Sequence, residues 1–133
     1  TTEFTMRATV GRGYEETVSR VRAALAEAGF GVLTEIDLRA TLAAKLGVET
    51  APRVILGACR PQLAHLALEV DPRIAALLPC NVVVREVEPG SVEVSIADPK
   101  AVFSLAPAET MGHVTDLPGA ARERLAAALA ALA

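Results

Sequence analysis

Hydrophobic and polar residues alternate near the start of the chain, as they do in a strand with one buried face. Between residues 4 and 10 the even positions are apolar and the odd positions are polar, which predicts a half-buried strand. The period then becomes helical, because apolar residues recur every three or four positions from 14 to 28 and Gly29 follows as a natural stop. The next apolar stretch, FGVLTEI at 30–36, predicts a second strand.

In the middle of the chain, predicted helices and strands continue to alternate. Asp37 can cap a helix with leucines at every fourth position, and Gly47 ends it. The run RVILGAC at 53–59 is continuously apolar, which is typical of a central strand. Pro61 then stands at the first position of a predicted helix over 61–70.

A hairpin is the clearest pattern in the second half. Two valine-rich runs within 81–98 flank the turn-forming pair Pro89-Gly90. Two Asp-Pro pairs, one before and one after this hairpin, each predict a cap and a short helical piece. The stretch 106–119 has no period and is predicted to be a loop, and the alanine-rich segment 120–133 is predicted to be the last helix.

The order of these elements, β-α-β-α-β-α-β-β-α-α, predicts an α+β fold in which helices pack on one sheet. A chain of 133 residues fits a single domain, 1–133, and a hydrophobic fraction of 52% excludes a disordered chain. The net charge is −3, Lys and Arg are scattered, and aromatic residues make up 3%. We therefore expect no nucleic-acid partner, since both a basic footprint and a base-stacking platform are missing.

The sequence also bears on location. No apolar run approaches the ~20 residues that a membrane span needs, so no membrane partner is expected. The opening residues lack the charged start and apolar block of a secretion signal. Two cysteines in such a chain suggest free thiols in a reducing compartment, and the predicted location is cytoplasmic.

Candidate chemistry gathers at the two cysteines. Cys59 ends the predicted central strand, two residues before the helix that begins at Pro61. Bare amide hydrogens at the helix start, together with the charge of Arg60, would lower the pKa of this thiol. Cys80 has no such neighbour, but the amide of Asn81 beside it could contact a ligand or hold the turn.

Three interpretations of the thiols stay open. Both can be inert packing groups, since free cysteine is often buried. They can share a pocket with at least one accessible thiol, if the strand ending at Cys59 neighbours the hairpin strand that starts after Cys80. In the third interpretation the two cysteines form a disulfide or bind a metal ion together, although no C-x-x-C spacing is present.

The two histidines complete the candidates. His65 falls opposite the apolar face of its helix, so we expect it to be solvated and to pair with Glu69 four residues on. Its functional alternative is a base for Cys59. That apolar face is predicted to consist of Leu63, Leu66, Ala67 and Val70. His113 lies in the predicted loop and is expected to be exposed, and no complete metal site is predicted.

Several motifs occur in a familiar order: EAGFGVLTEIDLRATLAAKLGVE, ILGACRPQLAHLAL, LLPCNVVV and VSIADPKAV. Between about Tyr14 and Val102 the chain resembles the bacterial and archaeal family named domain of unknown function 302. The resemblance implies a curved, mostly antiparallel sheet with helices packed on it, like that of the TATA-box-binding protein, and a homodimer. The family's cysteine motifs correspond to Cys59 and to Cys80 with Asn81. Arg60 stands where the family pattern has Asn.

These observations lead to one expected function and two alternatives. We expect a homodimeric module that binds a small-molecule ligand near Cys59 and Cys80, with contacts from Asn81, Arg60 and His65. The first alternative is a thiol enzyme or redox sensor, in which Cys59 is oxidised or attacks and Cys80 resolves the product. The second is a structural dimer with inert cysteines. The sequence identifies neither a cofactor nor a ligand.

Overall fold

A computed structural model describes residues 3–107, 109–110 and 116–132, and five antiparallel strands form its one sheet. Within the sheet the order is β1-β5-β4-β3-β2, so β3 and β4 are interior neighbours and β2 is an edge. The strands are β1 Thr5–Val10, β2 Gly31–Asp37, β3 Arg53–Cys59, β4 Cys80–Glu88 and β5 Ser91–Ala97.

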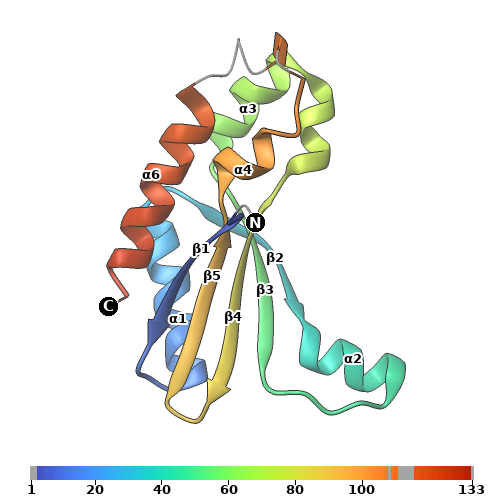
Figure 1. Cartoon of the computed structure of the whole chain (residues 1–133), viewed down its shortest axis with the longest axis vertical. Helices are drawn as coiled ribbons and strands as arrows, with labels where there is room; N and C mark the ends of the chain where they lie inside the picture. Colours follow the sequence, from blue (N-terminus) through green and yellow to red (C-terminus); the bar gives the residue numbers. More distant parts are fainter. Residues whose placement is uncertain (1–2, 108, 111–115, 133) are drawn as a thin grey trace.

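The helices lie in three places around the sheet. Figure 1 shows α1 and α6 side by side on one face, α3 and α4 grouped beyond one end, and α2 projecting away from the sheet. The helices are α1 Tyr14–Glu27, α2 Leu38–Leu46, α3 Pro61–Val70, the short 3-10 helix η1 Pro72–Leu77, α4 Pro99–Phe103 and α6 Asp116–Ala130. This arrangement confirms the predicted α+β fold with helices packed on an antiparallel sheet.

The main core lies between the sheet and the helix pair α1 and α6. Val21 and Leu25 of α1 and Leu125 of α6 are almost wholly buried, as the helical spacing of apolar residues predicts. The strands meet them with alternate residues, and β5 buries Val92 and Val94 completely. The predicted hairpin is therefore confirmed, including the dry and wet faces of its second strand.

A second, smaller core lies at the end of the sheet where α3, η1 and α4 meet. Ala67, Ile74 and Phe103 form its buried centre, and Leu78 and Leu117 pack against it. The two clusters of buried side chains are distinct. The end of β3 and the start of β4 therefore lie where two separately packed cores meet.

The predicted aspartate caps are present at three helix starts. Asp37 accepts a hydrogen bond from the backbone of Ala40 in α2, at 2.9 Å. Asp71 and Asp98 accept equivalent bonds two residues on, in η1 and α4, also at 2.9 Å. Each cap satisfies an amide hydrogen that the helix itself leaves bare.

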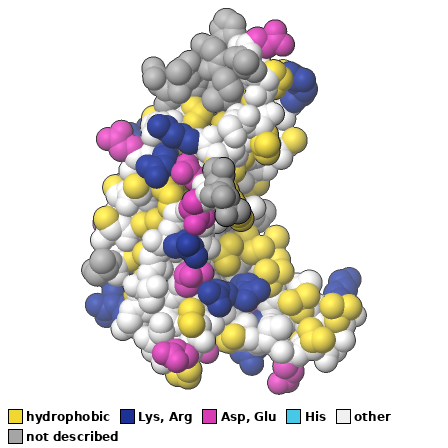
Figure 2. All heavy atoms as spheres, viewed as in Figure 1, with side chains coloured by type: hydrophobic (Ala, Val, Ile, Leu, Met, Phe, Trp, Pro, Cys, Tyr) yellow, Lys and Arg dark blue, Asp and Glu magenta, His cyan; other side chains and the backbone are white. Residues whose placement is uncertain are grey.

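Helix α2 buries no residue of its own. It is nine residues long, and its last leucine, Leu46, is 70% exposed. Leu33 and Ile36 on β2 and Val48 after the helix are exposed as well. Figure 2 shows apolar side chains on this projecting segment and in the hollow beside it. We call residues 31–48 the arm.

Two predictions about helices need correction. Residues 106–119 were predicted to be a loop, but helix α6 begins at Asp116. The helix can include Pro118, because this residue stands in the first turn, where a missing amide hydrogen costs nothing. Leu66 and Val70 were predicted on the buried face of α3 but are 52% and 39% exposed. None of the helices in the described part of the chain is long and apolar enough to cross a bilayer.

Candidate functional site

Strand pairing brings the two cysteines together. Cys59 is the last residue of β3 and Cys80 is the first residue of β4. In the antiparallel register Ala58 is the direct partner of Cys80, so the cysteines occupy adjoining positions on neighbouring strands. The strand pairing on which the sequence analysis made their convergence conditional is therefore present.

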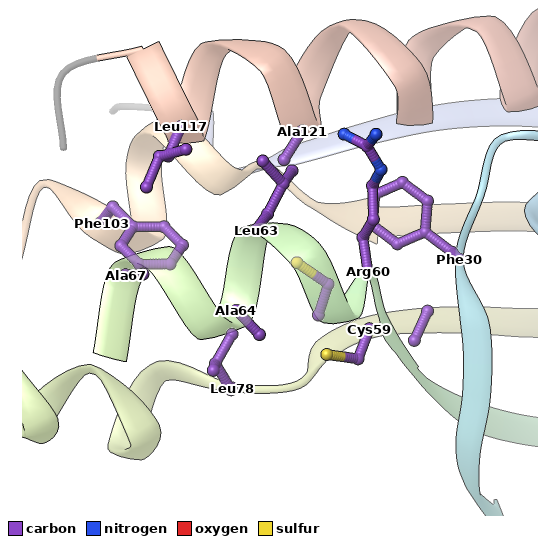
Figure 3. Close-up of a pocket in the computed structure, with 12 residues that line it drawn as sticks. Phe30, Cys59, Arg60, Leu63, Ala64, Ala67, Leu78, Phe103, Leu117 and Ala121 are labelled. Carbon is purple, nitrogen blue, oxygen red and sulfur yellow. The ribbon is translucent and has the colours of Figure 1, made fainter. Parts of the chain in front are cut away.

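Both cysteines line the same cavity, which has a volume of about 40 Å³. Its walls come from both cores: Phe30, Ala58 and Ala121 belong to the larger cluster, and Ala67 and Phe103 to the smaller. The remaining lining residues are Arg60, Leu63, Ala64, Leu78 and Leu117. Figure 3 shows α3 on one side of the cavity, with α6 above it. The cavity is therefore the space that side-chain packing leaves between the two cores.

Burial decides the protonation of both thiols. It raises the pKa of Cys59 above the ordinary thiol value, because loss of water disfavours the charged form. The pKa of Cys80 rises to about 11, first through burial and then through repulsion from the Cys59 thiolate. Both groups are therefore protonated at neutral pH.

This overturns the predicted low pKa of Cys59. The sequence argument weighed the bare amides at the start of α3 and the positive charge of Arg60. It could not weigh desolvation, which depends on Phe30 and Leu78 from distant elements that share the cavity with Cys59. Desolvation is the cause of the shift.

Arg60 lies at the cavity wall and also serves as the N-cap residue of α3, without a side-chain capping bond. Its side chain is half-buried. In Figure 3 its guanidinium reaches toward α6. Arg60 is the one ionised side chain among the lining residues, since both cysteines are neutral.

The other two candidate residues lie away from the cavity. His65 is 75% exposed, and its Nε2 lies 3.3 Å from the carboxylate of Glu69, so the predicted solvated pair is confirmed. Asn81 is exposed on β4 opposite Gly57 and does not line the cavity. His113, predicted to be an exposed loop residue, lies outside the described residues.

The sequence analysis missed most of the cavity wall. Phe30, Leu78, Phe103 and Leu117 come from four separate segments, and each reads locally as an ordinary core residue. Only the tertiary fold shows that they face a common space. Within the described ranges no three His, Cys, Asp or Glu side chains are grouped so that they could hold a metal ion.

Comparison with known proteins places this architecture in a family. The family model described as "Domain of unknown function DUF302" matches residues 6–132. The crystal structure of an uncharacterised conserved DUF302 protein from Bacillus stearothermophilus is similar over 99% of this chain and 100% of that one. The two share 28% sequence identity with a TM-score of 0.87. No curated protein matches the chain. The chain belongs to the DUF302 family.

Proposed function

We propose that this protein is a binding module that holds a small apolar ligand, or the apolar part of one, between Cys59 and Cys80. The observation that carries the proposal is the cavity of about 40 Å³ at the meeting point of the two cores. Well-packed proteins leave few spaces larger than a water molecule. Nine of the twelve residues around this space are aliphatic or aromatic, two more are the neutral thiols, and Arg60 is the twelfth. Such walls favour hydrocarbon over water.

The state of the thiols supports binding over catalysis. A thiolate is the nucleophile in thiol enzymes and the form that oxidants attack. The raised pKa values of Cys59 and Cys80 oppose formation of the thiolate. Neutral, polarisable thiols instead suit van der Waals contact with a ligand. The thiol enzyme or redox sensor is therefore the weaker alternative.

The size of the cavity limits the ligand. A volume of about 40 Å³ holds only a few non-hydrogen atoms. Pockets for drug-sized molecules are much larger, typically ~300–1,000 Å³. We therefore choose n-butanol as the probe. A ceiling of about 1.5 kcal/mol of binding free energy per non-hydrogen atom limits its dissociation constant to micromolar or weaker.

The experiment is an NMR titration of the protein with n-butanol, following the methyl signals of Leu63 and Leu78. We expect saturable shifts at both residues. Ala64→Leu should abolish them, because the larger side chain fills the cavity that Ala64 lines. Ala43→Leu is the matched control, since Ala43 is exposed on α2. Shifts that do not saturate, or that survive Ala64→Leu, would refute the proposal.

We also propose that the protein forms a homodimer, and the arm supports this proposal. A helix shorter than about 12–15 residues is marginal in water unless it packs against something, yet α2 has nine residues and none is buried. The neighbouring strand β2 is a sheet edge with Leu33 and Ile36 exposed. A second copy covering the arm would bury these side chains and stabilise the helix.

A further inference from the structure

We propose that the ligand of this cavity carries an anionic head group, a carboxylate, and that Arg60 and Arg124 bind it at the cavity rim. The inference rests on the proposed function, because it assigns the apolar part of the same ligand to the cavity. It adds the chemical class: a short-chain monocarboxylate. Four observations carry it.

The first observation is the composition of the wall. Among the residues around the cavity, Arg60 alone carries a charge at neutral pH. A guanidinium beside an aromatic ring and an aliphatic wall loses part of its hydration. Arg60 shares the cavity wall with Phe30 and with aliphatic side chains. A ligand that fills the cavity would therefore end next to a positive charge.

The second observation is a second guanidinium, that of Arg124, which lies near the Arg60 side chain although Arg124 does not itself line the cavity. A β-carbon added to Gly29 would lie 3.4 Å from Nε of Arg60 and 3.7 Å from Nη1 of Arg124. The two arginines thus converge on one glycine from α3 and α6. Arg124 donates a hydrogen bond from Nη1 to the carbonyl oxygen of Ala28, at 3.3 Å, which holds its side chain over this point.

The third observation is the lack of a neutralising partner. Six of the nine other arginines each form an ion pair with a carboxylate. Among the described residues neither Arg60 nor Arg124 has one. Two like charges held this close repel each other, and an anion placed between them would relieve the repulsion.

The fourth observation is the backbone at Gly29, which has φ +87°. This left-handed conformation favours glycine, and the absence of a side chain lets the side chains of Arg60 and Arg124 both approach the backbone here. A carboxylate suits two neighbouring guanidiniums, because its two oxygens accept hydrogen bonds from guanidinium groups in a planar, paired geometry.

The test compares three probes by the same NMR titration: butyrate, n-butanol and inorganic phosphate. Butyrate and n-butanol share the apolar chain, and phosphate shares only the charge. We expect butyrate to bind about tenfold more tightly than n-butanol, since a hydrogen bond to a charged group strengthens binding by at least about that factor. Phosphate should bind more weakly than butyrate, because it leaves the cavity empty.

Variants separate the head group from the chain. Arg60→Gln should weaken butyrate binding about tenfold and should weaken n-butanol binding much less. Dispersed methyl signals in the spectrum of the variant show that it is folded. Arg124→Gln should weaken butyrate in the same direction. Arg12→Gln is the matched control, because Arg12 is exposed and lies outside both the cavity and the arm, and it should change neither.

Each outcome decides one point. Equal affinity of butyrate and n-butanol, with no effect of Arg60→Gln, would overturn the carboxylate inference and leave the proposed apolar binding intact. Phosphate binding as strong as that of butyrate, and insensitive to Ala64→Leu, would mean a bare anion site and would also overturn it. Failure of both chain-bearing probes to bind would overturn the proposed function itself.

Discussion

At the scale of single residues, the chemistry of this site follows from how water is excluded. Cys59 and Cys80 lie at the ends of neighbouring strands, and the apolar residues that enclose the cavity also withdraw solvent from both sulfurs. The effect is strong enough to raise the pKa of Cys80 to about 11. A cysteine near a helix start is reactive only when the helix field exceeds the desolvation penalty, and here it does not.

This leads to a prediction about reactivity. Alkylation by iodoacetamide at neutral pH should be slower for each thiol than for free cysteine, because the raised pKa values leave less thiolate. The rate should rise with pH, and for Cys80 it should reach half its maximum near pH 11. Mass spectrometry of Cys59→Ser and Cys80→Ser, each with one thiol left, measures the two rates separately.

The urea-unfolded protein provides the reference for both rates, since its thiols are solvated. Faster modification of Cys59 in the folded protein than in the unfolded protein at pH 6–7 would contradict this account. It would revive the thiol enzyme or redox sensor, because such a rate requires a lowered pKa.

At the scale of elements, the close approach of β2, β3 and the η1–β4 connection shapes the site. Gly57 of β3 has the side chain of Thr34 and the ring of Pro79 packed against the position where a β-carbon would be. Pro79 directly precedes Cys80, so this contact fixes the entry into β4. The absence of a side chain at Gly57 therefore helps to hold the two cysteines in register.

We predict that Gly57→Ala lowers the free energy of unfolding by about 1–3 kcal/mol, the usual range for overpacking in a closed site. Gly11→Ala is the control, since nothing lies within 4 Å of an added β-carbon there, and it should change stability by less than about 0.5 kcal/mol. Urea denaturation measures both values. Equal stability of the two variants would show that the contact at Gly57 has no structural weight.

Most elements of this fold were predictable because their signals are local. The alternation in β5, the spacing of Val21 and Leu25 in α1, and the aspartate caps each depend on a few neighbouring residues. The start of α6 was not predictable in this way. Pro118 and Gly119 indicate a loop when read alone, and packing of Leu117 against the smaller core overrides them.

The site was predictable only in part, for the same reason. The convergence of Cys59 and Cys80 followed from one correct assumption about strand pairing. The pKa of Cys59 did not follow, because its desolvation comes from residues far away in the sequence. Asn81 was a candidate through its place next to Cys80, but a neighbour in a strand points to the opposite face, and Asn81 does not line the cavity.

At the scale of the whole molecule, the arm leaves apolar side chains uncovered in a single copy. The arm exposes Leu33, Ile36 and Leu46 on a short helix and an edge strand. Exposed sheet edges with apolar side chains invite pairing with another chain. Self-association would resolve this exposure.

We predict that sedimentation velocity at micromolar concentration detects a dimer, and that Leu46→Glu shifts it to monomer, because a charge would be buried in the interface. Leu105→Glu is the control, since Leu105 is 77% exposed but lies outside the arm, and it should leave the dimer intact. A wild-type monomer would contradict the proposed homodimer. A dimer insensitive to Leu46→Glu would place the interface elsewhere.

The central claim is that the space between the two cores accepts an apolar guest. The most direct measurement is diffraction from crystals of the protein under xenon pressure, since xenon enters dry apolar cavities and scatters strongly. We expect a xenon peak in contact with Phe30, Leu63 and Leu78, and no such peak in Ala64→Leu. Xenon bound elsewhere in the wild-type crystal, with this cavity empty, would contradict the account.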